Sequence, residues 1–306
     1  MKKIFIILLI SYSSVAAALQ SDSTSFFSKS ESVNKQKAHL INYSVAALYP
    51  LSMSWLYTQW YTNYPQSSFH FFNDNSEWLQ MDKFGHTWDA YSISKPLFQL
   101  YNWAGYTNKE ATFRSCGISF FFQTTVEVFD GFSSQWGFSF GDVISNTSGI
   151  LLFGVQQLSW QEQKIKLKYS FHQTMYSKYR PNLLGSNLPE NILKDYNGLT
   201  YWISGSPSSF VKDNHGFPKW LGLAIGFGAD GLVGGERNPS EVDGKNIPAF
   251  NRRRQFYIAL DIDLAKINTK SEFINSVFHL INIIHIPTPT IEFTTNKKPV
   301  FHSFYF

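Results

Sequence analysis

Residues 160–171, WQEQKIKLKYSF, contain the point at which the periodicity of the chain changes. The apolar residues in this stretch alternate with Lys166 and Lys168, and a period of two residues is typical of a β-strand. The apolar residues before it recur at helical spacing instead. The sequence therefore predicts an α+β fold, with an N-terminal bundle of about four helices (residues 36–160) and a C-terminal antiparallel β-rich region (residues 161–306) packed on the helices.

Two apolar helices are expected in the first part of the bundle. The first is the segment 39–60. The second opens at Asn75 or Ser76, and we expect Pro96 to kink or end it, because proline cannot donate a backbone hydrogen bond.

Capping motifs mark the starts of the third and fourth helices. Thr107 and Glu110 have the spacing of a capping box, in which each side chain accepts from a backbone N–H of the first turn. Ser139 and Asp142 have the same spacing and are expected to open a helix that ends near Trp160. This capping role is by itself a sufficient reason for an acidic residue at position 142.

Strand periodicity recurs in the second half of the chain. It covers residues 221–228, 256–264 and 291–293, and the chain ends in the aromatic segment 301–306. Residues 271–284 have helical spacing. We expect four or five antiparallel strands, arranged as a partial sheet or as a barrel-like one.

The composition excludes two classes of protein. Of the 306 residues, 18% are aromatic and only 16% are charged, and the formal net charge is +4. A disordered chain would be rich in charge and poor in aromatic residues, and a nucleic-acid-binding protein would be strongly basic. The segment 226–231 matches G-x-G-x-x-G, but the helix that dinucleotide binding requires does not follow it. We therefore predict no nucleic-acid and no nucleotide partner.

The N-terminus has the features of an export signal. Two lysines precede the apolar segment 4–10, and the alanines at 16–18 provide small residues for cleavage. Residues 1–18 are therefore predicted to be a signal peptide, and residues 19–35 a polar linker. No cysteine lies near the cleavage zone, so no N-terminal lipid attachment is expected. These features predict an exported, periplasmic protein.

The aromatic surplus and the basic clusters bear on the choice of partner. Lys164, Lys166, Lys168 and the arginines 252–254 are expected to be solvated or to contact anionic headgroups. Aromatic residues favour the membrane interface. The predicted partner is therefore an envelope lipid or membrane surface in a Gram-negative envelope, with an envelope protein as the alternative.

Polar residues at i, i+4 spacing recur on three of the predicted helices. This spacing places both members of a pair on one helix face. The pairs are Asp82 with His86, Gln123 with Glu127, and Asp142 with Asn146, while Asp89 and Asp130 extend two of the faces and Lys83 lies beside the first pair.

Three interpretations of these pairs are open. Polar side chains inside an aromatic bundle are costly unless they bond one another, which favours a structural network that includes Asp130. A catalytic site would use Glu127, with its pKa raised by burial, His86, titrating near neutrality, and Asp142. The pairs could also lie in solvent. No cofactor is predicted, but carboxylates with one imidazole can bind a divalent cation whose identity is left unknown.

The helical motifs resemble those of a known family. The motifs Met81-Asp-Lys-Phe-Gly-His86, Asp130-Gly-Phe-Ser133 and Trp136-Gly-Phe-Ser-Phe-Gly-Asp142 resemble the YfiM-like family of predicted periplasmic lipoproteins, over residues 76–160. They are also distantly similar to the VanZ-like membrane proteins linked to glycopeptide resistance. The resemblance implies an envelope location and no reaction, since the YfiM-like family has no known function. The family's polar motif positions fall on Asp82, Lys83, His86, Glu127, Asp142 and Asn146.

The sequence supports two hypotheses about function and leaves open whether the protein is an enzyme. The first is an exported cell-envelope protein, a structural or lipid-facing component with a buried polar network. The second is an envelope enzyme that uses acid–base or metal-assisted chemistry on a lipid or cell-wall precursor. Its candidate catalytic residues are His86, Glu127 and Asp142, and the remaining network residues are Asp82, Lys83, Gln123, Asp130 and Asn146.

Overall fold

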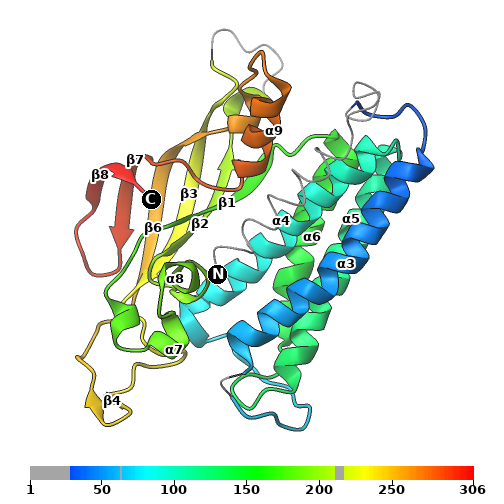
Figure 1. The fold of residues 1–306 in the computed structure, drawn as a ribbon. Coiled ribbons are helices and arrows are strands. Elements are labelled where there is room, and N and C mark those ends of the chain that lie inside the picture. The colour runs from blue at the N-terminus through cyan, green and yellow to red at the C-terminus, as the bar shows by residue number, and fades with distance from the viewer. Residues whose placement is uncertain (1–27, 63, 211–216) are drawn as a thin grey trace.

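The computed structural model describes residues 28–62, 64–210 and 217–306. It has a layer of helices on one side and a curved antiparallel sheet on the other (Figure 1). The expected α+β class is therefore confirmed. The predicted signal peptide, residues 1–18, and residues 19–27 of the predicted linker lie outside the described residues.

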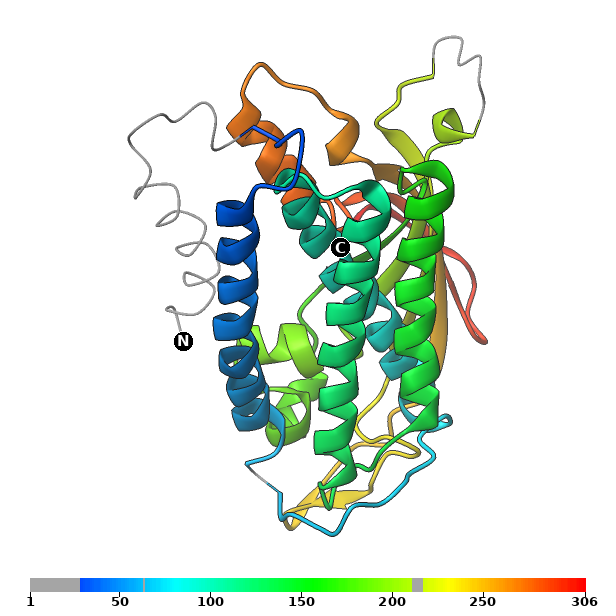
Figure 2. The same ribbon diagram turned by 90° about the vertical axis from the view of Figure 1, so that its right-hand side faces the viewer.

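Four long helices form the first layer, as expected. They are α3 (Lys35–Trp60), α4 (Met81–Trp103), α5 (Asn108–Gly131) and α6 (Phe140–Trp160). Figure 2 shows α3, α5 and α6 running side by side. Both predicted caps are present, since Thr107 and Glu110 form a capping box and the Ser139 side chain accepts from the backbone N–H of Asp142.

The second helix begins later than predicted, and of the two outcomes expected at Pro96 the end of the helix does not occur there. It begins at Met81, not at Asn75 or Ser76, because Glu77–Gln80 form a separate 3-10 turn (η1) with positive φ at three of its residues. Pro96 does not end α4, which continues to Trp103. The turn after the proline buries Phe98, and burial of such a side chain offsets the lost hydrogen bond.

Six strands form the main sheet, one or two more than expected. In sheet order they are β1 (Ile165–Phe171), β2 (Leu199–Gly205), β3 (Leu221–Asp230), β6 (Arg253–Ile262), β7 (Thr288–Thr294) and β8 (Val300–Tyr305). All neighbouring pairs are antiparallel. Among the described strands β1 and β8 are the two edges, so the sheet is open, as in the partial-sheet alternative.

Short elements connect these strands. They are the 3-10 turns η2 (Tyr176–Lys178), η3 (Pro207–Ser209) and η4 (Leu264–Lys266), the helices α7 (Pro181–Leu184), α8 (Leu188–Lys194) and α9 (Glu272–Ile281), and the hairpin of β4 (Glu241–Val242) and β5 (Lys245–Asn246). Helix α9 lies within the segment that has helical spacing in the sequence. Of the helices within the described residues, none combines the length and the hydropathy needed to cross a membrane.

The sheet is strongly curved, and its concave face buries two lysine–carboxylate ion pairs beside an aromatic cluster that includes Trp202 and Tyr257. Lys168 on β1 and Asp261 on β6 are separated by two strands, which in a flat sheet would place them roughly 14 Å apart. Their Nζ and Oδ2 atoms are 2.9 Å apart, and both side chains are buried. Lys166 is buried too, with its Nζ atom 2.6 Å from Oδ2 of Asp263. The expectation that these two lysines are solvated is therefore wrong, because the curvature encloses them with carboxylate partners.

Helix α4 packs on the convex face of the sheet, at β1 to β3. Phe84 stacks on Phe227 of β3 with ring centroids 4.3 Å apart, and Trp88 lies against Tyr169 of β1 at 4.5 Å. This contact covers only part of the convex face. The opposite side of α4 is packed against α5 and α6.

Candidate functional site

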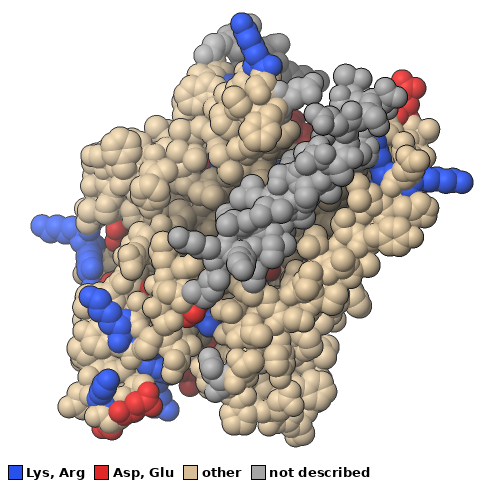
Figure 3. Space-filling view, in the orientation of Figure 1, with Lys and Arg blue, Asp and Glu red and all other residues tan. Residues whose placement is uncertain are grey.

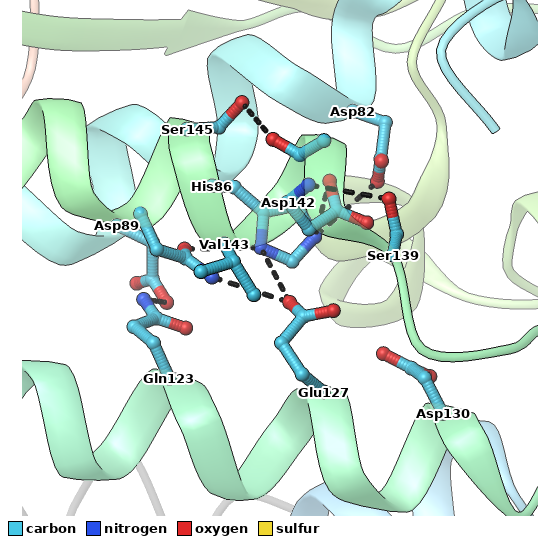
Figure 4. Close-up of polar contacts among 12 residues, drawn as sticks. Asp82, His86, Asp89, Gln123, Glu127, Asp130, Ser139, Asp142, Val143 and Ser145 are labelled. Carbon is cyan, nitrogen blue, oxygen red and sulfur yellow. Dashed lines mark hydrogen bonds and ion pairs between the residues drawn. The ribbon is translucent and has the colours of Figure 1, made fainter. Parts of the chain in front are cut away.

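The polar pairs predicted on three helices converge at one place between α4, α5 and α6 (Figure 4). We define the polar cluster as Asp82, Lys83, His86, Glu127, Asp142 and Asn146. Close packing of α4 and α6 positions these side chains. A Cβ atom on Gly149 of α6 would lie 2.1 Å from the carbonyl oxygen of Thr87 on α4, so only glycine permits this approach.

Lys83 is the centre of the ion pairs in the cluster. Its Nζ atom lies 2.6 Å from Oδ1 of Asp74, 2.9 Å from Oδ2 of Asp82 and 2.6 Å from Oδ1 of Asp142. Burial lowers the pKa of Lys83, but the carboxylates of Asp82 and Asp142 outweigh burial and hold it above its ordinary value. Lys83 is therefore a permanent cation that joins α4, α6 and the loop before η1.

His86 lies between the carboxylates of all three helices. Its Nε2 atom is 3.7 Å from Oδ1 of Asp82 and 3.6 Å from Oδ1 of Asp142. Its Nδ1 atom is 3.1 Å from Oδ1 of Asn146 and 3.5 Å from Oε1 of Glu127. The Asn146 amide in turn donates from Nδ2 to Oε1 of Glu127 at 3.2 Å.

The protonation state of His86 differs from the expected one. Burial lowers the pKa of His86, but the carboxylates of Asp142, Asp82 and Glu127 outweigh it and raise the pKa to about 10. The imidazole is therefore cationic at neutral pH, not poised near neutrality. A cationic imidazole cannot accept a proton, which weighs against His86 as a general base.

The carboxylates of the cluster are held in different states. Burial raises the pKa of Asp82, but the charges of His86 and Lys83 outweigh it and hold the pKa below its ordinary value. Burial raises the pKa of Asp142, with the Asp82 carboxylate adding to the effect, and it also raises the pKa of Glu127. Neighbouring carboxylates in one buried site do not ionise independently, so this divergence is expected.

Two residues of the predicted network lie beside the cluster. Gln123 donates from Nε2 to Oδ2 of Asp89 at 2.9 Å, about one turn further along both helices. Asp130 accepts at Oδ1 from the Tyr61 hydroxyl at 2.7 Å, and burial raises the pKa of Asp130 to about 8. Both contacts join helices, but neither residue contacts His86 or Lys83 through a described hydrogen bond or ion pair.

Sequence reasoning missed two contributors to the site. Asp74 lies in the loop before η1, where it accepts from the Ser139 hydroxyl at 2.6 Å and pairs with Lys83. Tyr196 lies in the turn before β2 and donates to Oδ1 of Asp82 at 2.7 Å. Neither has a periodic pattern in the sequence, since Asp74 is in a loop and Tyr196 comes from the other half of the chain.

The fold and the cluster define an α+β protein with an ionisable network at the meeting point of three helices. Residues 70–156 match the model of a family described as predicted periplasmic lipoprotein (DUF2279). The matched segment contains every residue of the polar cluster and Asp74. This match supports a relation to an uncharacterised periplasmic family. No curated protein and no solved structure matches the chain.

Proposed function

We propose that this protein is an exported envelope protein whose apolar outer faces contact lipid and whose polar cluster holds the helices together. The observation that carries the proposal is the apolar character of the uncovered part of the convex face. A sheet with one face in water places polar residues on that face. Here the buried concave face holds an aromatic cluster and the ion pairs of Lys166 and Lys168, while the uncovered convex face is also apolar.

A continuous row of apolar side chains crosses five strands of the convex face. Each member is the register partner of the next, and we call this set the apolar row: Ile203, Ile225, Ile258, Ile291 and Phe301. The side chains of Ile225 and Phe301 are 64% and 66% exposed, and those of the other three are 41–50% exposed. Exposed apolar patches of this extent are rare on soluble monomers and mark binding surfaces.

The helical layer also has an apolar outer face. Ile144, Leu151 and Val155 recur at helical spacing on α6 and are more than half exposed, while Asp142 and Asn146 point inward. On the face of the molecule drawn in Figure 3, the lysines and arginines lie at the left edge, the top and the upper right, and the described surface between them has few charges. A single protein partner covers one patch, whereas lipid can cover apolar faces on both layers, so we favour lipid.

The family comparison supports an envelope location for this surface. We further propose that residues 76–160 are related to the YfiM-like and VanZ-like proteins, whose polar motifs they resemble. The rival hypothesis is an envelope enzyme that uses His86, Glu127 and Asp142 for acid–base or metal-assisted chemistry. The cationic state of the His86 imidazole argues against that residue as a general base.

Vesicle flotation tests the proposal. Purified protein is mixed with vesicles of phosphatidylethanolamine and phosphatidylglycerol, and its fraction in the floating layer is measured. We expect the wild type to float, and we expect the double variant Ile225→Glu/Ile258→Glu to float at least fivefold less. Both side chains are half exposed or more, so the variant should keep the wild-type circular dichroism spectrum.

Leu188→Glu is the matched control, since Leu188 is 52% exposed on α8, away from the apolar row. It should float like the wild type. A wild-type protein that stays below the vesicles, or a double variant that floats as well as the wild type, would overturn the lipid contact.

A further inference from the structure

We propose that Asp82, His86 and Asp142 form a binding site for one divalent metal ion of the zinc class. Each residue offers one ligand atom, and these atoms all lie within 4.8 Å of one another. The inference concerns the interior of the helical layer and does not depend on lipid contact at the outer faces.

The distances between His86 Nε2 and the two aspartate oxygens are close to those between neighbouring ligand atoms of a bound metal ion. Its Nε2 atom lies 3.7 Å from Oδ1 of Asp82 and 3.6 Å from Oδ1 of Asp142, too far for hydrogen bonds. Around a tetrahedral zinc ion with bonds of about 2.0–2.1 Å, neighbouring ligand atoms lie about 3.4 Å apart. The two distances from Nε2 are thus close to the tetrahedral value, and the three ligand atoms, all within 4.8 Å of one another, would move together to bind one ion.

The ring of His86 is oriented as metal-bound imidazoles are. Its Nδ1 atom is 3.1 Å from the carbonyl oxygen Oδ1 of Asn146, which can only accept, so Nδ1 carries the proton and donates. Histidine ligands usually donate their second ring N–H to a carbonyl or carboxylate in this way. Asn146 is itself fixed by donating to Glu127 at 3.2 Å. The Nε2 atom is thereby left to face the two aspartates.

An unsatisfied oxygen at the site is the independent observation that points to a ligand. The Glu127 side chain is fully buried, and its Oε2 atom has no hydrogen-bond partner among the described residues. Figure 4 shows that Glu127 projects from α5 toward His86 and Asp142. A buried carboxylate oxygen without a donor is costly, and a divalent ion at Nε2, on the other side of the imidazole ring, would add positive charge to its surroundings.

The net charge of the polar cluster is also compatible with a bound divalent cation. An ion that binds at Nε2 replaces the proton that makes the His86 imidazole cationic in the metal-free protein. In that bound state the carboxylates of Asp74, Asp82, Glu127 and Asp142, when all are ionised, exceed the ammonium of Lys83 by three negative charges, and a divalent ion reduces this surplus to one. Oδ1 of Asp82 also accepts from Tyr196 and Oδ1 of Asp142 from Lys83, and each oxygen keeps a second lone pair for an ion.

The donor set selects the class of metal. One imidazole nitrogen and two carboxylate oxygens suit zinc, manganese or ferrous iron better than calcium or magnesium, which prefer oxygen ligands alone. Three protein ligands leave one position of a tetrahedral ion for water, as in zinc sites with an open position.

Zinc titration of the metal-free protein tests the site. The full chain is treated with EDTA, dialysed, and titrated with Zn²⁺ by calorimetry, with thermal unfolding as the second readout. We expect one ion per chain and a higher midpoint of unfolding with Zn²⁺. His86→Gln and Asp142→Asn should each weaken binding at least tenfold. Asp89→Asn, on the same helix but bonded to Gln123, should bind like the wild type.

X-ray absorption of the zinc-loaded wild type gives a test that does not depend on the folding of a variant. We expect one imidazole and otherwise oxygen ligands. A wild type that binds neither Zn²⁺ nor Mn²⁺, folded His86→Gln and Asp142→Asn variants with wild-type affinity, or a spectrum with two or more imidazoles would overturn the proposed site.

Discussion

The Nζ atom of Lys83 on α4 lies 2.6 Å from the Oδ1 atom of Asp142 on α6. The same ammonium lies 2.6 Å from Asp74, in a loop that belongs to neither helix. One lysine therefore joins three segments of the chain that meet only in the folded state. The Lys83 side chain is 12% exposed and that of Asp142 is 6% exposed, so water does little to screen the pair.

Replacing Lys83 by methionine should destabilise the protein by about 3 kcal/mol. The variant keeps the length of the side chain but leaves three carboxylates without their common cation, and removing one partner of a buried ion pair usually costs about 3–5 kcal/mol. The measurement is the free energy of unfolding from urea titration at pH 7.

Lys266→Met is the matched control for that experiment. Lys266 pairs with Glu162, but these two side chains are 32% and 34% exposed. An exposed pair of this kind contributes about 0–1 kcal/mol. Equal losses in the two variants would show that the position of Lys83 among three carboxylates has no special role in stability.

The grouping of polar residues on one face of each helix could be predicted because helical spacing is a local property of the sequence, but whether the three faces meet could not. Asp82 with His86, and Asp142 with Asn146, lie at i, i+4 on predicted helices, which fixes their helix faces. The ionisation of His86 could not be predicted in this way. It depends on three carboxylates from different helices, and their distances are set by how the helices pack.

Strand β2 was not predicted from the sequence, and the reason is also physical. In Leu199–Gly205 the adjacent aromatic residues Tyr201 and Trp202 obscure the alternation of the two faces. Tyr201 contacts α4 on the convex side, whereas Trp202 is buried on the concave side. Only the curvature of the sheet makes both faces suitable for large aromatic side chains, and curvature has no local pattern in the sequence.

Replacing Gly149 by alanine should destabilise the protein by about 2–3 kcal/mol, the usual effect of overpacking a close contact. The added Cβ would lie 2.1 Å from the carbonyl oxygen of Thr87 and 3.1 Å from the backbone nitrogen of Tyr91, so α4 and α6 would have to separate. Thermal and urea unfolding measure the loss. If the polar cluster depends on this approach, the variant should also lose the zinc response proposed above.

Gly117→Ala is the corresponding control on α5. An added Cβ at this exposed position has no heavy atom of the described residues within 4 Å. Alanine is the better helix former by about 0.8–1 kcal/mol, so this variant should be slightly more stable than the wild type. A loss of stability in both variants would mean that helix packing at Gly149 is not the cause.

The acid sensitivity of the protein should depend in part on His285, which is buried on the concave face of the sheet. Its ring stacks on Trp202 with centroids 4.0 Å apart, and its Nε2 atom is 3.1 Å from the carbonyl oxygen of Leu260. Burial lowers the pKa of His285 from its ordinary value of 6.5 to about 4. Between these values the unfolded chain binds more protons than the folded one, so stability falls as the pH decreases from about 7 to 4.

The shift of His285 corresponds to a loss of about 3 kcal/mol over that interval. His285→Gln can still donate to the carbonyl of Leu260 but cannot titrate. Its free energy of unfolding should therefore decrease by about 3 kcal/mol less than that of the wild type between pH 7 and pH 4. Urea unfolding at half-unit steps of pH measures both curves, which should run parallel above pH 7. Curves that stay parallel down to pH 4 would show that protonation of His285 does not contribute to acid unfolding.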